Sequence, residues 1–71
     1  MKVKEIYNLF DGRVDIEYGE YYENEVTLNN ENISKYGDYD IIEIVGFSYY
    51  GYGYEGNGIA LKIKMEEKNN D

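Results

Sequence analysis

The stretch that decides the fold reads Ile59-Ala60-Leu61-Lys62-Ile63-Lys64-Met65. Large apolar side chains stand at every second position and alternate with an alanine and two lysines, which is the period of a β-strand with one buried face. Such a strand needs neighbouring strands and a layer that covers its apolar face. The rest of the chain is therefore expected to supply a sheet and an element that packs on it.

Three further segments have the pattern of strands. Apolar and charged residues alternate over residues 13–18, and a second alternation follows over residues 21–28. Residues 40–50 form the most apolar segment of the chain, in which Glu43 stands between two isoleucines. With residues 59–65, these segments predict four strands.

The helical signals are short. Apolar residues recur at intervals of three and four over residues 3–10, which predicts a two-turn amphipathic helix that Gly12 ends. Residues 33–37 fit one helical turn with Asn32 as its N-cap, although Gly37-Asp38 could equally form a plain turn. The predicted fold is therefore α+β: a short N-terminal helix packed on a four-stranded, mainly antiparallel sheet.

Length and composition limit the class of protein. We expect residues 1–71 to form one small domain, with residues 68–71 as a frayed tail. The absence of Cys excludes disulfides and thiolate chemistry, and no apolar run approaches the roughly 18 residues that span a membrane. No signal-peptide stretch opens the chain, so a cytoplasmic protein without membrane partners is expected. The helix is too short to cover the whole sheet, so Ile41, Val45 and Phe47 are expected to remain for a partner or a second copy.

The charge is acidic and unevenly placed. The chain has 15 Asp and Glu residues against 7 Lys and Arg residues and no His, for a net charge of −8. Residues 14–61 contain ten of the acids against Lys35 alone and so carry −9, which leaves both ends near neutral. A chain of this charge is repelled by DNA, RNA and anionic membranes, so no direct nucleic-acid partner is expected.

The pairing of residues 13–18 with residues 21–28 decides where the acids gather. A three-residue loop over residues 19–21 keeps one face of this hairpin apolar and collects carboxylates on the other. Neighbouring carboxylates then form a square of about 5 Å by 7 Å. The expected pairs are Glu17 opposite Glu23 and Asp15 opposite Glu25.

Like charges placed directly opposite one another are destabilising, so the square needs an explanation. Either solvent and the nearby Lys62 and Lys64 compensate it, or it is kept for a cationic protein partner. A divalent metal is disfavoured because flat strands lack the converging loop of a calcium site. We expect no metal and no cofactor.

Residues 49–58 are rich in Tyr and Gly and are expected to form the loop between the last two strands. Gly51, Gly53 and Gly56 have the spacing of a dinucleotide-binding motif, but the segment leads into a strand and not a helix, so that function is excluded. Two interpretations remain open. The rings either fold back over the sheet or form a contact surface like that of antibody loops, beside acids that attract cations.

The opening residues, Val3-Lys4-Glu5-Ile6 through Asp11-Gly12-Arg13-Val14, and the overall layout resemble small proteins of low-GC bacterial prophages. In size and acidity the chain is also similar to phage-encoded inhibitors of host defence, the anti-CRISPR and anti-restriction proteins. This resemblance implies a small single domain that occupies a nucleic-acid-binding surface of its target.

We therefore expect a non-enzymatic binding or inhibitor protein that docks on the basic surface of a nucleic-acid-binding protein, such as a CRISPR-Cas effector. An enzyme is disfavoured because His and Cys are absent and the chain is too short to enclose a sugar between two carboxylates. The alternative is a self-associating accessory protein, a homodimer, whose acidity serves only solubility. The residues expected to contact the partner are Asp15, Glu17, Glu20, Glu23, Glu25, Tyr49, Tyr50, Tyr52 and Tyr54.

Overall fold

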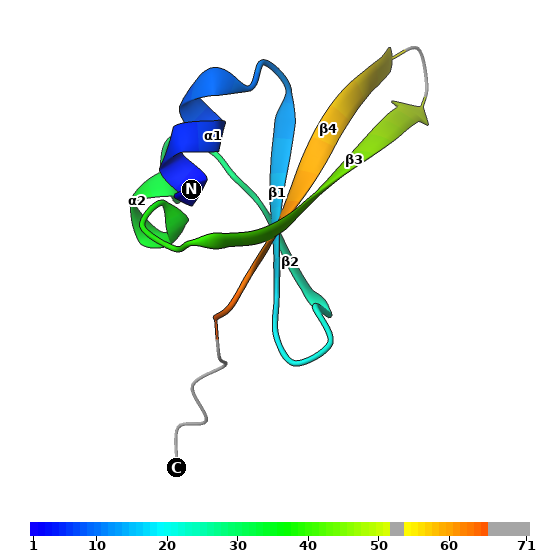
Figure 1. The fold of residues 1–71 in the computed structure, drawn as a ribbon. Helices are drawn as coiled ribbons and strands as arrows, with labels where there is room; N and C mark the ends of the chain where they lie inside the picture. Colours follow the sequence, from blue (N-terminus) through cyan, green and yellow to red (C-terminus); the bar gives the residue numbers. More distant parts are fainter. Residues whose placement is uncertain (52–53, 66–71) are drawn as a thin grey trace.

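A computed structural model, which describes residues 1–51 and 54–65, has two short helices and four strands (Figure 1). The predicted α+β class is confirmed. In chain order the elements are α1 (Val3–Leu9), β1 (Arg13–Tyr18), β2 (Asn24–Thr27), α2 (Ile33–Tyr36), β3 (Ile41–Gly51) and β4 (Tyr54–Ile63).

The strands form one mixed sheet in the order β2-β1-β4-β3. Two antiparallel hairpins, β1 with β2 and β3 with β4, are joined by parallel pairing of β1 with β4. β1 and β4 are therefore central, and β2 and β3 are the two edges. Both helices lie on the same side of this sheet (Figure 1). We call that side the covered face and the opposite side the open face.

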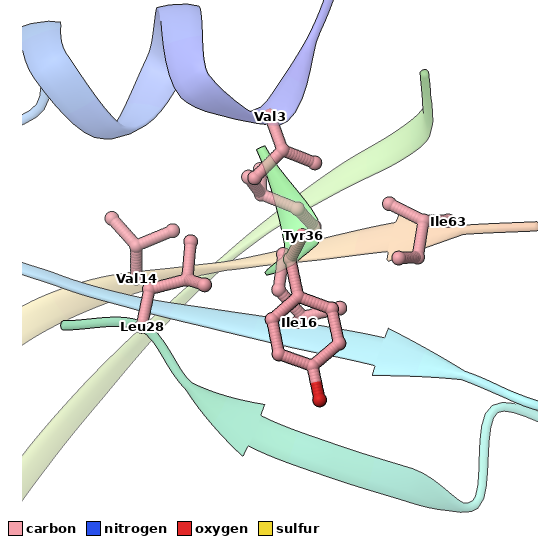
Figure 2. Packing of buried hydrophobic residues seen from close by; sticks show 7 residues of the cluster. Val3, Val14, Ile16, Leu28, Tyr36 and Ile63 are labelled. Carbon is pink, nitrogen blue, oxygen red and sulfur yellow. The ribbon is translucent and has the colours of Figure 1, made fainter. Parts of the chain in front are cut away.

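The hydrophobic core lies between the helices and the covered face. Ile16 of β1 and Leu61 of β4 are fully buried, because successive strand residues point to opposite faces and these two point toward the helices. Val3 of α1 and Tyr36 of α2 belong to the same cluster, and Val3 points from the helix toward the sheet (Figure 2). The period-two pattern over residues 59–65 thus corresponds to a real inward face.

Helix α1 is held at its start by the segment that leads into β3. The backbone amides of Val3 and Lys4 donate to the carbonyls of Tyr39 and Gly37, each at 3.0 Å. These bonds satisfy two of the amides that a helix leaves unpaired in its first turn. The helix ends before Gly12, whose φ of 157° and close approach to the Asn57 carbonyl leave no room for a side chain.

The prediction of a loop over residues 49–58 is wrong for the backbone that the structure describes. Tyr49 pairs with Gly56 and Tyr50 with Glu55, so both strands continue into this segment as a ladder. Tyrosine favours strands, and each added pair is held in register by the pair before it. Pairing of β1 with β4 begins only at Gly58, and the hairpin extends beyond it as a two-stranded ribbon (Figure 1). Residues 68–71 lie outside the described residues.

Within the part of the chain that the structure describes, no helix has both the length and the apolar character needed to cross a membrane.

Candidate acidic interface

The acids of the first hairpin lie in a register different from the predicted one. Ile16 pairs with Val26 and Glu17 with Glu25, two residues away from the expected alignment. This register is favoured because it puts Val26, and not the polar Asn24, opposite the buried Ile16. The predicted square of carboxylates therefore does not form.

A wider loop accompanies this register. Residues 19–23 separate β1 from β2, and Tyr22 adopts a left-handed conformation with φ of 56°. The Tyr22 amide donates to the Gly19 carbonyl at 3.2 Å, and the Tyr21 amide donates to a Glu23 carboxylate oxygen at 2.9 Å. Glu20 and Glu23 consequently lie exposed in the loop instead of on the strand ladder.

Four charged residues cross the whole sheet on the open face, one from each strand. Glu25 of β2 lies opposite Glu17 of β1, Glu17 pairs with Lys62 of β4, and Lys62 pairs with Glu43 of β3. Neighbouring strands are about 4.8 Å apart, so adjacent members are close enough to interact. We call Glu25, Glu17, Lys62 and Glu43 the charged row. With three acids and one base, its formal charge is −2.

Asp15 lies beside the row but is not available to a partner. It is 2% exposed, and one of its carboxylate oxygens accepts hydrogen bonds from Arg13 Nε and from the Thr27 hydroxyl, each at 2.9 Å. Arg13 Nη2 also donates to the Thr27 hydroxyl at 3.2 Å. This buried carboxylate is thus neutralised within the open face. The structure places it under the surface to which sequence reasoning assigned it.

Glu25 is an acid with unfavourable surroundings. Asp15 contacts it diagonally across the hairpin, and hydrogen bonding to that carboxylate and its negative charge raise the pKa of Glu25 above its usual range; Glu17 adds to this effect. Arg13, which is already hydrogen-bonded to Asp15, lowers the Glu25 pKa only as a smaller opposing influence. Glu25 is therefore an exposed acid held against two others.

The cation of the row is largely engaged by one acid. Lys62 Nζ lies 3.0 Å from a Glu43 carboxylate oxygen, and this hydrogen bond and charge, followed by the Glu17 charge, raise the pKa of Lys62. The same Nζ stands 5.1 Å from the centre of the Tyr22 ring. Lys62 therefore joins the two halves of the row, whereas Lys64 is exposed beyond the end of β4. Glu43 and its ion pair were missing from the predicted site.

An apolar strip adjoins the row on the same face. Val45 pairs with the buried Ala60 and is 42% exposed, and Phe47 lies over Gly58 with the Arg13 guanidinium 5.7 Å from its ring centre. Of the three apolar residues expected to remain uncovered, Val45 does so. Ile41 and Phe47 are half-buried.

The tyrosines expected to contact the partner are only partly described. Tyr49, Tyr50 and Tyr54 have their backbone in the β3–β4 ladder. Tyr52 lies outside the described residues. The charged row and the apolar strip are therefore the parts of the candidate interface with defined geometry.

Over residues 1–51 and 54–65, no group of three or more acidic side chains has the arrangement of a metal site. A hollow of about 250 Å³ opens near the first hairpin loop, lined by Gly19, Glu20, Tyr22, Ile42, Ile63, Lys64 and Met65. Its lining includes a single carboxylate, whereas glycoside hydrolysis normally requires two.

No protein-family model, curated protein or solved structure matches the chain. The fold and the open face define the class of this chain: a small α+β protein with an acidic, partly apolar surface.

The repulsion between Glu25 and Asp15 leads to a prediction about the stability of the folded protein. Because the Glu25 pKa is raised, the folded protein holds that proton more tightly than the unfolded chain, so stability falls as the pH rises through the raised pKa. Glu25→Gln removes this charge, and we expect it to raise Tm by about 1–5 °C at pH 7. Thermal unfolding followed by circular dichroism measures the change.

Two controls make this prediction specific. Well below the ordinary pKa of 4.5, Glu25 is protonated in both states, so the advantage of the variant should disappear there. Glu31→Gln removes an exposed acid outside the charged row and should leave Tm unchanged at both pH values. An unchanged Tm for Glu25→Gln at pH 7 would show that the acids do not repel one another.

Proposed function

We propose that this chain is a small, non-enzymatic binding or inhibitor protein whose charged row docks on the basic surface of a nucleic-acid-binding protein. The observation that supports this most strongly is the placement of Glu25. Glu25 is exposed and lies opposite Glu17 and next to Asp15. Arg13 and Thr27 donate hydrogen bonds to Asp15, and Arg13 offsets the repulsion at Glu25 only in part. A carboxylate that weakens the free protein becomes favourable when a partner brings a cation.

The chemistry of the open face fits a partner rich in arginine. A guanidinium binds carboxylates through two parallel hydrogen bonds and is weakly hydrated, so it suits the adjacent Glu17 and Glu25. The exposed Val45 lies on the same face and adds apolar contact, which acids alone do not provide. Surfaces that bind nucleic acid combine such cations with groups that stack on bases.

The proposal extends to the biological setting that the resemblance implies. The chain would be encoded by a phage or another mobile element and act in the host cytoplasm, on a defence protein such as a CRISPR-Cas effector. Competition with nucleic acid is then the expected mode of inhibition, because both ligands would use the same cations on the target.

A capture experiment with a competitor tests this function. The immobilised protein is incubated with a bacterial lysate at low salt, and the bound proteins are eluted with an excess of short duplex DNA. We expect basic nucleic-acid-binding proteins in the eluate. We also expect their retention to fall steeply between about 50 and 200 mM salt.

A pair of variants with equal net charge shows whether the charged row is responsible. Glu17→Gln with Glu25→Gln should lower the affinity for the captured protein by about 10- to 100-fold. Asp11→Asn with Glu31→Gln removes the same charge from exposed positions outside the row, and should change the affinity by less than about twofold. Equal losses in both variants, or elution that is insensitive to DNA, would contradict the proposed function.

A further inference from the structure

Strand β3 is a long sheet edge without the usual protection. It spans 11 residues, pairs with β4 on one side and contains neither Pro nor Lys. Its first residue is covered by the N-terminal segment, since the Ile41 amide donates to the Met1 carbonyl at 2.9 Å, so the edge offered to another strand begins after Ile41. Edge strands normally carry such residues because their unpaired amides and carbonyls otherwise attract another strand. Three of its apolar side chains, Ile42, Ile44 and Val45, are 55%, 48% and 42% exposed. Over its described length, the one irregularity of β3 is a register shift between Ile41 and Glu43.

The two edges of the sheet differ in charge, and this difference favours a second copy of the chain at β3. The only charged residue of β3 is Glu43, and its ion pair with Lys62 neutralises it. The opposite edge, β2 with its loop, carries Glu23 and Glu25 without an ion pair among the described residues. In a chain of net charge −8, β3 is therefore the edge that a second, equally acidic copy approaches with least repulsion. A cationic protein that docks across the open face meets these acids toward the β2 edge and does not need the unpaired backbone of β3.

The shape of β3 is also self-complementary. Ile44 and Gly46 pair with Leu61 and Ile59, so both belong to the covered face. No atom lies within 4 Å of the position that a Gly46 side chain would occupy. In an antiparallel pair centred on Val45, Ile44 lies opposite Gly46 of the partner subunit on the same face, and fills that open space.

We propose that β3 pairs with β3 of a second copy, antiparallel and centred on Val45, to form one continuous sheet. Each copy offers the same surface, as a two-fold dimer requires. Val45 meets its own equivalent, and Glu43 lies opposite an uncharged residue. The charged row reaches the far edge of each copy at Glu25, so the acidic half of the sheet stays accessible in the dimer.

The absence of Cys allows a direct test of the register. Residues directly opposite in an antiparallel pair have Cα atoms about 4.5–5.5 Å apart, which is within the range of a disulfide. Val45→Cys should therefore give a dimer of twice the 8.4 kDa chain mass on mild oxidation. Glu25→Cys, on the opposite edge, should remain mostly monomeric. Equal cross-linking of the two variants would overturn the proposed pairing.

Gly46→Val tests the same pairing without damaging the subunit. The monomer has room for the side chain, and valine favours strands, so the folded subunit should be at least as stable. The added side chain blocks Ile44 of the partner subunit and should weaken dimerisation at least tenfold in sedimentation equilibrium. A wild-type protein that stays monomeric at millimolar concentration would contradict the proposal, and so would a Gly46→Val variant that dimerises as well as the wild type.

Failure of the proposed dimer can be distinguished from failure of the proposed function, because the two depend on different residues. Glu17→Gln with Glu25→Gln changes the charged row and not β3, so it should leave the sedimentation behaviour of the protein unchanged. Gly46→Val should reduce dimerisation while each subunit retains its acidic half.

Discussion

Leu61→Ala is expected to lower the free energy of unfolding by about 2–5 kcal/mol and to leave much of the protein unfolded. Leu61 is fully buried in the central strand β4, within the cluster that joins both helices to the sheet. Truncation removes apolar contacts and leaves a cavity that the paired strands on either side cannot close. A domain of this size rarely has a free energy of unfolding above about 3–5 kcal/mol, so this one substitution removes most of it.

Urea unfolding followed by circular dichroism measures this effect. Ile42→Ala is the matched control, since it truncates an aliphatic side chain of equal size that is 55% exposed on the edge strand. We expect the control to cost less than about 1 kcal/mol. Similar losses for the two variants would show that the core does not lie under the helices as described.

Gly58→Ala is the second substitution with a large expected effect, about 1–3 kcal/mol of lost stability. A Cβ at Gly58 would meet the Phe47 ring and would lie 2.9 Å from the Arg13 carbonyl. The ring can rotate away, but the carbonyl belongs to the backbone of the paired strand β1. The substitution therefore forces β1 and β4 apart at the point where their parallel pairing begins.

The consequence for the open face is specific. Arg13 pairs with Gly58 and supplies a hydrogen bond to the buried Asp15, so a shift there also disturbs the carboxylates beside the charged row. Gly46→Ala introduces the same methyl group in β3, where no atom lies within 4 Å, and is expected to be neutral or stabilising by up to about 1 kcal/mol. Thermal unfolding of both variants checks the contrast. A Gly58→Ala variant as stable as Gly46→Ala would contradict the described contact.

Elements with a strong local signal could be predicted from the sequence. The helix starting at Val3, the strand from Arg13 to Tyr18 and the helical turn after Asn32 occur close to where periodicity and turn residues placed them. The parallel pairing of β1 with β4 joins segments more than forty residues apart. No local pattern records such a contact, because tertiary packing decides it.

The sequence placed Glu17 and Glu25 on one face of the first hairpin, but it paired Glu17 with Glu23 and Asp15 with Glu25, and those pairs are wrong. The loop that sets the observed register depends on Tyr22 in a left-handed conformation, for which tyrosine gives no signal. The ion pair of Asp15 could have been predicted, since Arg13 stands two residues away on the same face of the strand.

The most direct test of the acidic interface is to map it with nuclear magnetic resonance. Backbone amide spectra of the ¹⁵N-labelled protein would be recorded as the captured nucleic-acid-binding protein is added, and again after displacement by duplex DNA. We predict that the largest changes lie at Glu17, Glu25, Glu43, Val45 and Lys62 and reverse when DNA is added. Changes confined to α1 and α2, or no reversal by DNA, would contradict the claim that the open face binds a cationic partner.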